Sequence, residues 1–401
     1  MLSPSRKQIF KDFKWFWIVG TAGLILYLTL NLINDRFQMH DLEVYHGAWQ
    51  ELLKSQSPYG QSFGLSSGFY KYAPLPALLF SPLFAFGWLP ARIIYFVLIG
   101  FSILLTLPRI LREIKVHWPV NRSLLVIILT LGMLGGHLSR ELLLGNVNWL
   151  LFVGLLIVFR FREERSWLGG LVLGMLFTCK PHFIFLLPWF VARGKWKLLL
   201  WGGGSFAVGL FLPALLFDWS KNYEWLQLWL EAMQSHNVNL WESANTIYHL
   251  IDELTLHAIS GINNGGTILI GLGLTISAVS ISGLMIKHGG FFKRAYASQE
   301  QLEFFLILGL IPNLVHTDTE HFLWGTPLIM IFVSFLTRYR WLWLVFFLCM
   351  IPYALATPDL WGRAVAEWLI ESGSIGLANL VMLGTATVLS YRVITSFCEN
   401  S

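Results

Sequence analysis

Long apolar runs separated by short polar segments are the feature that most restricts how this sequence can fold. Of the 401 residues, 55% are hydrophobic and only 13% are charged, whereas soluble chains carry about 25% charged residues. An apolar run of about 20 residues is long enough to cross a bilayer as a helix. Because helices satisfy their own backbone hydrogen bonds in lipid, the sequence predicts an all-α, polytopic membrane helical bundle.

About twelve crossings are predicted from hydropathy. Ten are single runs, near residues 15–33, 92–108, 123–139, 142–160, 197–217, 264–286, 301–316, 322–337, 341–357 and 375–391. Two shorter runs, 167–178 and 183–192, are separated by Lys180-Pro181 and predict a hairpin. The run 74–89 contains three prolines and is too short to cross comfortably, so we expect a re-entrant or tilted half-helix. The chain is thus interpreted as one membrane domain, 1–401.

Basic residues are divided unevenly between the two sets of loops. With a cytoplasmic N-terminus, the inner segments hold 20 of the 28 Lys and Arg residues, and the outer segments hold 16 of the 23 Asp and Glu residues. Short cytoplasmic loops carry such a basic excess. We therefore expect both termini in the cytoplasm, location in the inner (plasma) membrane, and chemistry on the periplasmic or extracellular side. The net charge of +5 comes from these loops and indicates no nucleic-acid partner.

Two long outer segments, 34–73 and 218–263, are expected to carry short helices on the membrane surface. In the first segment, apolar residues at helical spacing are Val44, Ala48 and Leu52. In the second, they are Trp225, Leu226, Trp229 and Met233. Such amphipathic helices lie in the interface with their apolar faces in lipid.

Asp41 stands at the head of the first outer segment. An Asp directly before a helical run is a common N-cap, and a carboxylate placed there can also act as a general base. The two roles can coexist, since a cap fixes the position of the carboxylate. A set of residues around it, Asp41, Tyr45, Ala48, Tyr59 and Tyr72-x-Pro74, resembles the first outer loop of glycosyltransferase family 87.

The resemblance implies a GT-C membrane enzyme. Members of that family take sugar, usually mannose, from a polyprenyl-phosphate donor, and an acidic residue early in this loop is the proposed catalytic base. Asp41 is the matching residue here. The implied partners are a polyprenyl-phosphate sugar donor, a glycan or glycolipid acceptor and the lipid bilayer.

Gly145-Asn146-Val147-Asn148 lies at the outer start of the 142–160 run. Two amides are expensive in lipid, so Asn146 and Asn148 are expected to face the protein interior. They could equally be a hydrogen-bonding pair at a helix end. The family has a similar Gly-polar-x-Asn, in which Asn146 replaces an expected Gln, and the resemblance assigns both residues to sugar or acceptor binding.

Lys180-Pro181-His182 interrupts two apolar runs away from the basic inner loops. A lysine there must be solvated or paired with an anion, unless it only snorkels to the interface. The family also shows a Lys-Pro at this place. The resemblance implies that Lys180 offsets the charge of a leaving polyprenyl phosphate, with His182 near the sugar or acceptor.

The segment 316–321 contains two histidines and two carboxylates, but their spacing matches no standard metal-ligand pattern. A polar turn between spans has the same composition. Glu320-His321 resembles an acidic-His pair of the family, which implies phosphate binding by His321 and sugar or acceptor binding by Glu320. No metal or cofactor is expected.

The remaining candidates are outer-face cations and tyrosines. Lys71 and Arg140 lie beside predicted spans and can meet a phosphate. Tyr45, Tyr59 and Tyr72 can stack on sugar faces or anchor the chain at the interface.

Together these features predict a membrane glycosyltransferase with Asp41 as the base, transferring a hexose with inversion. A transporter or flippase of lipid-linked sugars is the alternative, and it has much the same composition. Such a protein favours polar sites at the membrane midplane and repeated halves with broken helices. Neither feature is evident in the sequence.

Overall fold

The computed structural model describes residues 13–65, 68–118, 120–236, 240–255, 264–287, 293–316, 318–356 and 361–399 of the chain. Within these ranges every regular element is a helix, and the β contact found is an isolated bridge between Ser62 and Phe69. The all-α prediction is confirmed for this part of the chain.

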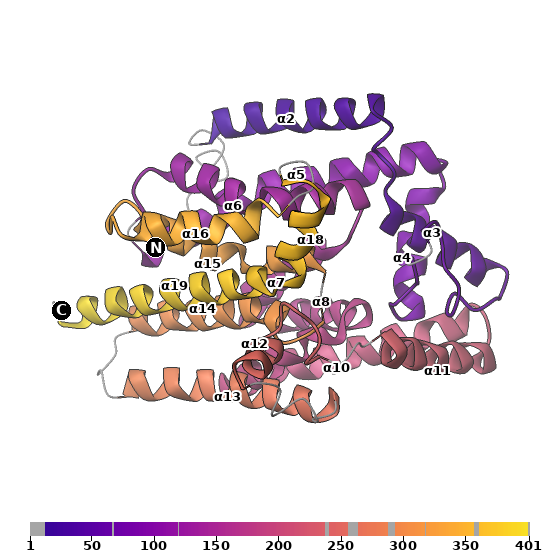
Figure 1. Cartoon of the computed structure of the whole chain (residues 1–401). Coiled ribbons are helices and arrows are strands. Elements are labelled where there is room, and N and C mark those ends of the chain that lie inside the picture. Colours follow the sequence, from indigo (N-terminus) through magenta and orange to yellow (C-terminus); the bar gives the residue numbers. More distant parts are fainter. Residues whose placement is uncertain are drawn as a thin grey trace.

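Several of the described helices have the length and composition of membrane spans. Five are both long and apolar enough to cross, namely α2 (Lys14–Ile33), α5 (Trp88–His117), α6 (Ser123–Leu144), α10 (Trp196–Phe211) with η2 (Leu212–Leu215), and α19 (Ser374–Glu399). Most of the helices lie along one common direction, and α2 begins at the same end of the bundle at which α19 ends (Figure 1). The count of twelve crossings and the re-entrant path of the run 74–89 remain predictions.

Other helices, most of them shorter than these five, make up the rest of the bundle. They are α7 (Asn148–Phe161), α8 (Ser166–Cys179), η1 (Pro181–Leu186), α9 (Leu187–Ala192), α12 (Ile247–Leu254), α13 (Asn264–Lys287), α14 (Lys293–Leu310), η3 (Ile311–Asn313), η4 (Thr319–Gly325), α15 (Thr326–Phe335), α16 (Leu342–Ala354) and α18 (Arg363–Glu371). All ten residues of α15 are buried, and it packs against α6, α14 and α19. The core of the bundle therefore surrounds α15.

Two interruptions between successive helices position the site described below. Gly145 ends α6 in the left-handed conformation (φ 69°), a conformation that glycine adopts at little cost. A Cβ on Gly145 would lie 3.1 Å from the Cβ of Leu42, so the start of the first outer helix packs directly on this turn. The predicted boundary at residue 142 was wrong, because hydropathy does not register the turn and α7 begins only at Asn148.

The second break is the predicted hairpin tip. Helix α8 ends at Cys179, Lys180 is extended (φ −137°, ψ 101°) and Pro181 begins η1. A residue that precedes proline is disfavoured in the helical conformation. The interruption at Lys180-Pro181 is confirmed.

Three helices lie at the opposite end of the bundle from the start of α2 and the end of α19. They are α3 (His40–Leu53), α4 (Pro74–Phe84) and α11 (Trp219–His236) (Figure 1). Both predicted outer helices therefore form. Their apolar stripes, however, face protein rather than lipid, since Ala48 and Leu52 are fully buried and Trp225 is 1% exposed. The residues of α11 that are exposed include Trp219, Tyr223 and Leu230. Helix periodicity predicts a buried face but not what buries it.

Buried amides attach the second outer segment to the bundle. Asn313 donates to the carbonyl of Asn245 at 2.9 Å and to that of Gly376 at 3.1 Å. Asn379 donates to the side-chain oxygen of Asn313 at 2.6 Å. A buried amide costs free energy unless it is paired. These bonds therefore hold η3, the second outer segment and α19 in one fixed arrangement.

Ion pairs at the other end of the bundle hold α14 against its neighbours. Arg162 pairs with Glu300 at 2.6 Å, Lys195 pairs with Glu300 at 2.8 Å, and Arg193 pairs with Glu303. Arg162 and Arg193 directly follow α7 and α9, and Lys195 directly precedes α10 (Trp196–Phe211), whereas Glu300 and Glu303 lie in the middle of α14.

Candidate active site

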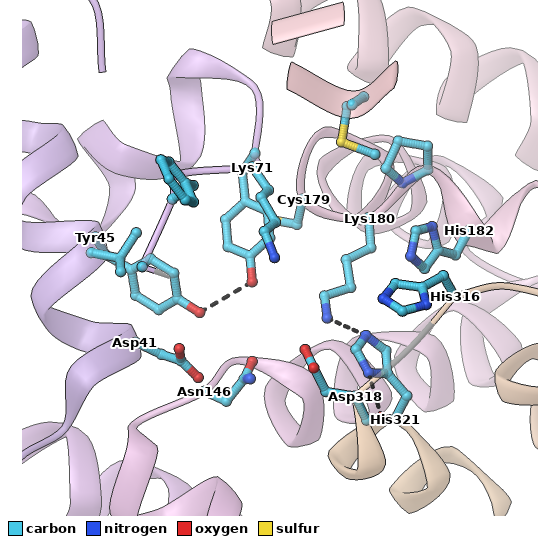
Figure 2. Close-up of a pocket in the computed structure, with 16 residues that line it drawn as sticks. Asp41, Tyr45, Lys71, Asn146, Cys179, Lys180, His182, His316, Asp318 and His321 are labelled. Atoms are coloured by element: carbon cyan, nitrogen blue, oxygen red, sulfur yellow. Dashed lines mark hydrogen bonds between the residues drawn. The ribbon is translucent and has the colours of Figure 1, made fainter. Parts of the chain in front are cut away.

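A cavity of about 130 Å³ lies where the outer helices meet the bundle. It is lined by α3, the segment before α4, the α6–α7 turn, the α8–η1 break and the η3–η4 segment. The predicted residues that line it are Asp41, Tyr45, Lys71, Tyr72, Asn146, Lys180, His182 and His321. Figure 2 shows the carboxylate of Asp41 on one side of this space and the amine of Lys180 on the other, with Asp318 and Asn146 between them. Segments far apart in sequence thus converge on one polar pocket.

Asp41 does not cap its helix. The N-cap of α3 is Met39, which is left-handed (φ 54°), and no side chain caps that end. The Met39 amide instead donates to the Leu143 carbonyl at 3.0 Å, so α6 fixes where α3 starts. The N-cap interpretation is therefore wrong. Among the described residues the Asp41 carboxylate accepts no hydrogen bond, and it points into the cavity (Figure 2).

The surroundings of Asp41 favour its protonated form more than water does. Burial raises its pKa from 3.8 to about 7, and the negative charges of Glu320 and Asp318 act in the same direction. Lys180 and Lys71 oppose the rise without cancelling it. A carboxylate with a pKa near the working pH is well suited to take up a proton during a reaction.

Lys180 is held inside the protein rather than snorkelling outward. It is 8% exposed, and its ammonium donates to the Asn148 side-chain oxygen at 2.5 Å and to Nε2 of His321. Nδ1 of His321 lies 3.0 Å from the Asp318 carbonyl, which can only accept, so Nδ1 carries the ring proton and Nε2 is the acceptor. Two of the three ammonium protons are thereby used, and the third remains for a group in the cavity.

Glu141 orients Asn148 toward Lys180. This carboxylate is fully buried in α6, and it accepts the Trp149 amide at 2.6 Å and the Asn148 side-chain NH₂ at 3.3 Å. With its NH₂ so engaged, the amide of Asn148 turns its oxygen to the ammonium. Asn148 itself is fully buried, as predicted, and it acts on the pocket through Lys180. Glu141 was not predicted from the sequence. A carboxylate beside two apolar runs is nevertheless typical of a functional site.

Arg140 and Glu320 form an ion pair with each other. Neither lines the cavity, although both were predicted to bind substrate. Glu320 is fully buried while the Arg140 side chain is 54% exposed. In this arrangement Glu320 influences the pocket through its charge, which raises the pKa of Asp41.

The tyrosines form one wall. The hydroxyl groups of Tyr45 and Tyr72 are 3.1 Å apart, and the ring of Tyr45 stacks on Phe80 at 4.6 Å. Tyr59 lies outside the cavity lining and donates to the Tyr72 carbonyl at 2.8 Å. Tyr45 and Tyr72 therefore face the cavity, whereas Tyr59 supports the wall from behind.

The remaining predicted residues lie around the rim. Burial lowers the pKa of Lys71, and the charges of Asp318 and Asp41 oppose that shift. The Lys71 carbonyl accepts the Trp229 indole N–H at 3.1 Å, so α11 holds this part of the rim. The rings of His182 and His321 lie side by side, with centroids 6.1 Å apart. His316 and Asp318 also line the cavity, although neither was singled out from the sequence.

Such a bundle, with the Asp41 carboxylate, the buried Lys180 and the half-buried Lys71 around one cavity, has the helices of an integral membrane protein and the groups of a polar, charged site. The model of glycosyltransferase family 87 matches residues 69–288, more than half of the 401 residues. The chain belongs to glycosyltransferase family 87. The match includes Lys71, the Asn146–Asn148 turn and Lys180, whereas Asp41 and the segment 316–321 lie outside it.

A curated relative is an α-(1→3)-arabinofuranosyltransferase of Corynebacterium glutamicum. It is 25% identical over 177 residues, which are 44% of this chain. The chain matches only 40% of the length of that relative. No solved structure matches the chain significantly.

Proposed function

We propose that this enzyme transfers a hexose, mannose in the first instance, from a polyprenyl-phosphate donor to an acceptor hydroxyl on the non-cytoplasmic face. One observation carries the proposal: the Asp41 carboxylate, which accepts no hydrogen bond from any described residue, faces a buried ammonium, Lys180, across one cavity. Glycosyl transfer from a phosphate needs both groups. One accepts the proton of the attacking hydroxyl, and the other offsets the charge of the departing phosphate.

The reaction is a single displacement at the anomeric carbon. Asp41 in its carboxylate form takes the acceptor's hydroxyl proton while that oxygen bonds to the anomeric carbon. The bond between this carbon and the phosphate oxygen breaks, and its electron pair leaves with the polyprenyl phosphate. Attack opposite the leaving group inverts the centre, so a β-linked donor gives an α-linked product.

Lys180 acts on the leaving group. Its ammonium is already fixed by Asn148 and His321, and its third proton is available to the phosphate. The phosphate gains charge as the bond breaks, so a fixed cation stabilises the transition state more than the bound donor. Lys71 lies on the same cavity and adds a second positive charge. Asn146, His182, Tyr45 and Tyr72 line the space left for the sugar and the acceptor.

The relative from Corynebacterium glutamicum supports a second donor of the same chemical class. Its name describes transfer of arabinofuranose, a five-carbon sugar. The roles of Asp41 and Lys180 are unchanged for such a donor, since they act on the hydroxyl and on the phosphate rather than on the sugar ring.

The test is a comparison of donors with the purified, full-length protein in detergent. Synthetic polyprenyl-phosphate mannose, polyprenyl-phosphate arabinofuranose and the corresponding nucleotide sugars are each supplied with a membrane glycan extract, and release of polyprenyl phosphate or nucleotide is measured. We expect one polyprenyl-phosphate sugar to be consumed and the nucleotide sugars to be left intact. Consumption of a nucleotide sugar alone would refute the proposed donor class.

Asp41→Asn tests the base within the same assay. The amide keeps the shape of the side chain but cannot take a proton at neutral pH, so turnover should fall at least ~100-fold. Asp35→Asn is a matched control, because Asp35 is exposed in the same outer segment and does not line the cavity. Parent-like turnover of Asp41→Asn, with product formed, removes Asp41 from the mechanism.

A further inference from the structure

A second, larger cavity lies at the other end of α7 from the candidate active site. Its volume is about 600 Å³, within the range of about 300–1,000 Å³ typical of small-molecule sites. It lies between the last turns of α5 and α7 and the middle of α14. Asn148, which binds Lys180, begins α7, whereas Arg160 and Phe161 of this cavity end it. The two cavities are therefore separate sites.

The walls of this cavity are mainly apolar. Aliphatic and aromatic side chains from all three helices line it, namely Ile110, Val153, Leu156, Ile157, Phe159 and Phe305. Ile157 is 36% exposed, and Leu105, one turn before Arg109 on α5, is 39% exposed. Since α5 is long and apolar enough to cross a membrane, this part of the cavity is continuous with a surface suited to lipid chains.

The charged groups are concentrated at the polar ends of α5 and α7. Arg109 and Arg160 line the cavity and are exposed, and neither forms an ion pair or a side-chain hydrogen bond with a described residue. Arg162 also lines it but is occupied by Glu300 and by the Phe159 carbonyl. Glu113 is the acidic residue of the lining, and it pairs with neither free arginine. His117 is held by Ser298 at 2.6 Å. The rim therefore carries excess positive charge.

We propose that this cavity binds one molecule of an anionic phospholipid. Arg109 and Arg160 hold its phosphodiester, and one acyl chain lies against the apolar wall between α5 and α7. Charge complementarity and position both favour this ligand. Arg109 and Arg160, neither of which is paired with a described residue, stand where the apolar parts of α5 and α7 end, which is the depth of lipid phosphates. Arginine is the residue best suited to bind phosphate oxygens in pairs.

The position of the two arginines also distinguishes lipid binding in this cavity from a nonspecific attraction of surface cations to anionic lipids. Lys115 and Arg165 are exposed at the same end of the bundle but do not line the cavity. If the arginines acted only through bulk surface charge, removing any two of these four cations would have the same effect. A bound lipid depends instead on the two that border the cavity.

The experiment is native mass spectrometry of the purified full-length protein in detergent. Phosphatidylglycerol, phosphatidylcholine with the same acyl chains, and inorganic phosphate are the three probes. We expect phosphatidylglycerol to bind more tightly than phosphatidylcholine, and inorganic phosphate not to displace it. The double variant Arg109→Gln/Arg160→Gln should bind phosphatidylglycerol roughly 30-fold more weakly, because each cation near a lipid headgroup contributes about 1 kcal/mol.

The control pair is Lys115→Gln/Arg165→Gln, which should keep the parent affinity. Ile157→Trp fills the apolar part without changing charge, and it should also weaken phosphatidylglycerol binding. If the double variant fails to fold, Ile157→Trp still tests whether the lipid binds in this cavity. The proposal is overturned by equal affinity for the two lipids, by displacement with inorganic phosphate, by an equal loss in the control pair, or by unchanged binding to Ile157→Trp.

Discussion

Replacement of Lys180 by methionine separates electrostatic catalysis from simple packing. Methionine keeps the length and apolar character of the side chain and removes its charge. In the structure the ammonium is held by Asn148 and His321 and has one proton left for the cavity. Deleting one such preorganised group raises a barrier by roughly 2–4 kcal/mol. At 1.36 kcal/mol for each factor of ten, turnover should fall roughly 30- to 900-fold.

The effect on folding should be smaller, because two contributions oppose each other. The substitution leaves two buried acceptors, on Asn148 and His321, without a donor, which costs about 1–3 kcal/mol each. It also removes the desolvation penalty of a buried charge, which is several kcal/mol. The unfolding temperature of Lys180→Met should therefore stay close to that of the parent, and kinetic effects can be compared on folded protein.

Steady-state kinetics on the preferred lipid-linked donor provide the measurement. Turnover should fall more than donor affinity, because the phosphate gains charge only as the bond breaks. Lys180→Arg should recover only part of the activity, since a planar guanidinium does not replace a point charge in a confined site. Lys195→Met is the matched control: it removes a lysine from the ion pairs at the opposite end of the bundle. If Lys180→Met and Lys195→Met turn over alike, the electrostatic role of Lys180 is refuted.

Three further predictions concern pH, the tyrosine wall and topology. Since Asp41 must be unprotonated and its pKa is about 7, kcat/KM should rise with pH up to about 7, and it should fall again at higher pH because Lys180 must keep its proton and burial lowers the pKa of that lysine. Glu320→Gln removes a nearby negative charge that raises this pKa, so it should move the rise to lower pH; an unmoved profile contradicts the assignment. Tyr59→Phe leaves a buried carbonyl without its donor and should lower the free energy of unfolding by about 1–3 kcal/mol, measured by denaturant titration; an unchanged stability contradicts it. A cysteine at Gln61 should react with an impermeant thiol reagent outside intact cells and one at Glu164 should not, and the reverse pattern would place the site in the cytoplasm.

Local properties of the chain were enough to predict the bundle and several of its breaks. Apolar runs predict helices, because backbone groups in lipid have no other partners, and five of the described helices are long and apolar enough to cross a membrane. The interruption at Lys180-Pro181 follows from the conformational limits that proline imposes on the residue before it. Lys71 was found from its position beside a predicted span, whereas Asp41, Tyr45 and Lys180 were singled out by position together with the resemblance to glycosyltransferase family 87; the structure brings all four to one cavity.

Only the tertiary structure determines which charged groups pair, because the partners lie in distant parts of the chain. Arg140 and Glu320 are 180 positions apart and pair with each other rather than facing substrate. Lys180 and His321 are 141 positions apart, and their contact fixes the ammonium. Glu141 matters only because the turn at Gly145, between α6 and α7, brings Asn148 within its reach. The protonation of Asp41 has the same origin, since a carboxylate's pKa is set by burial and neighbouring charges, neither of which can be read from its position in the sequence.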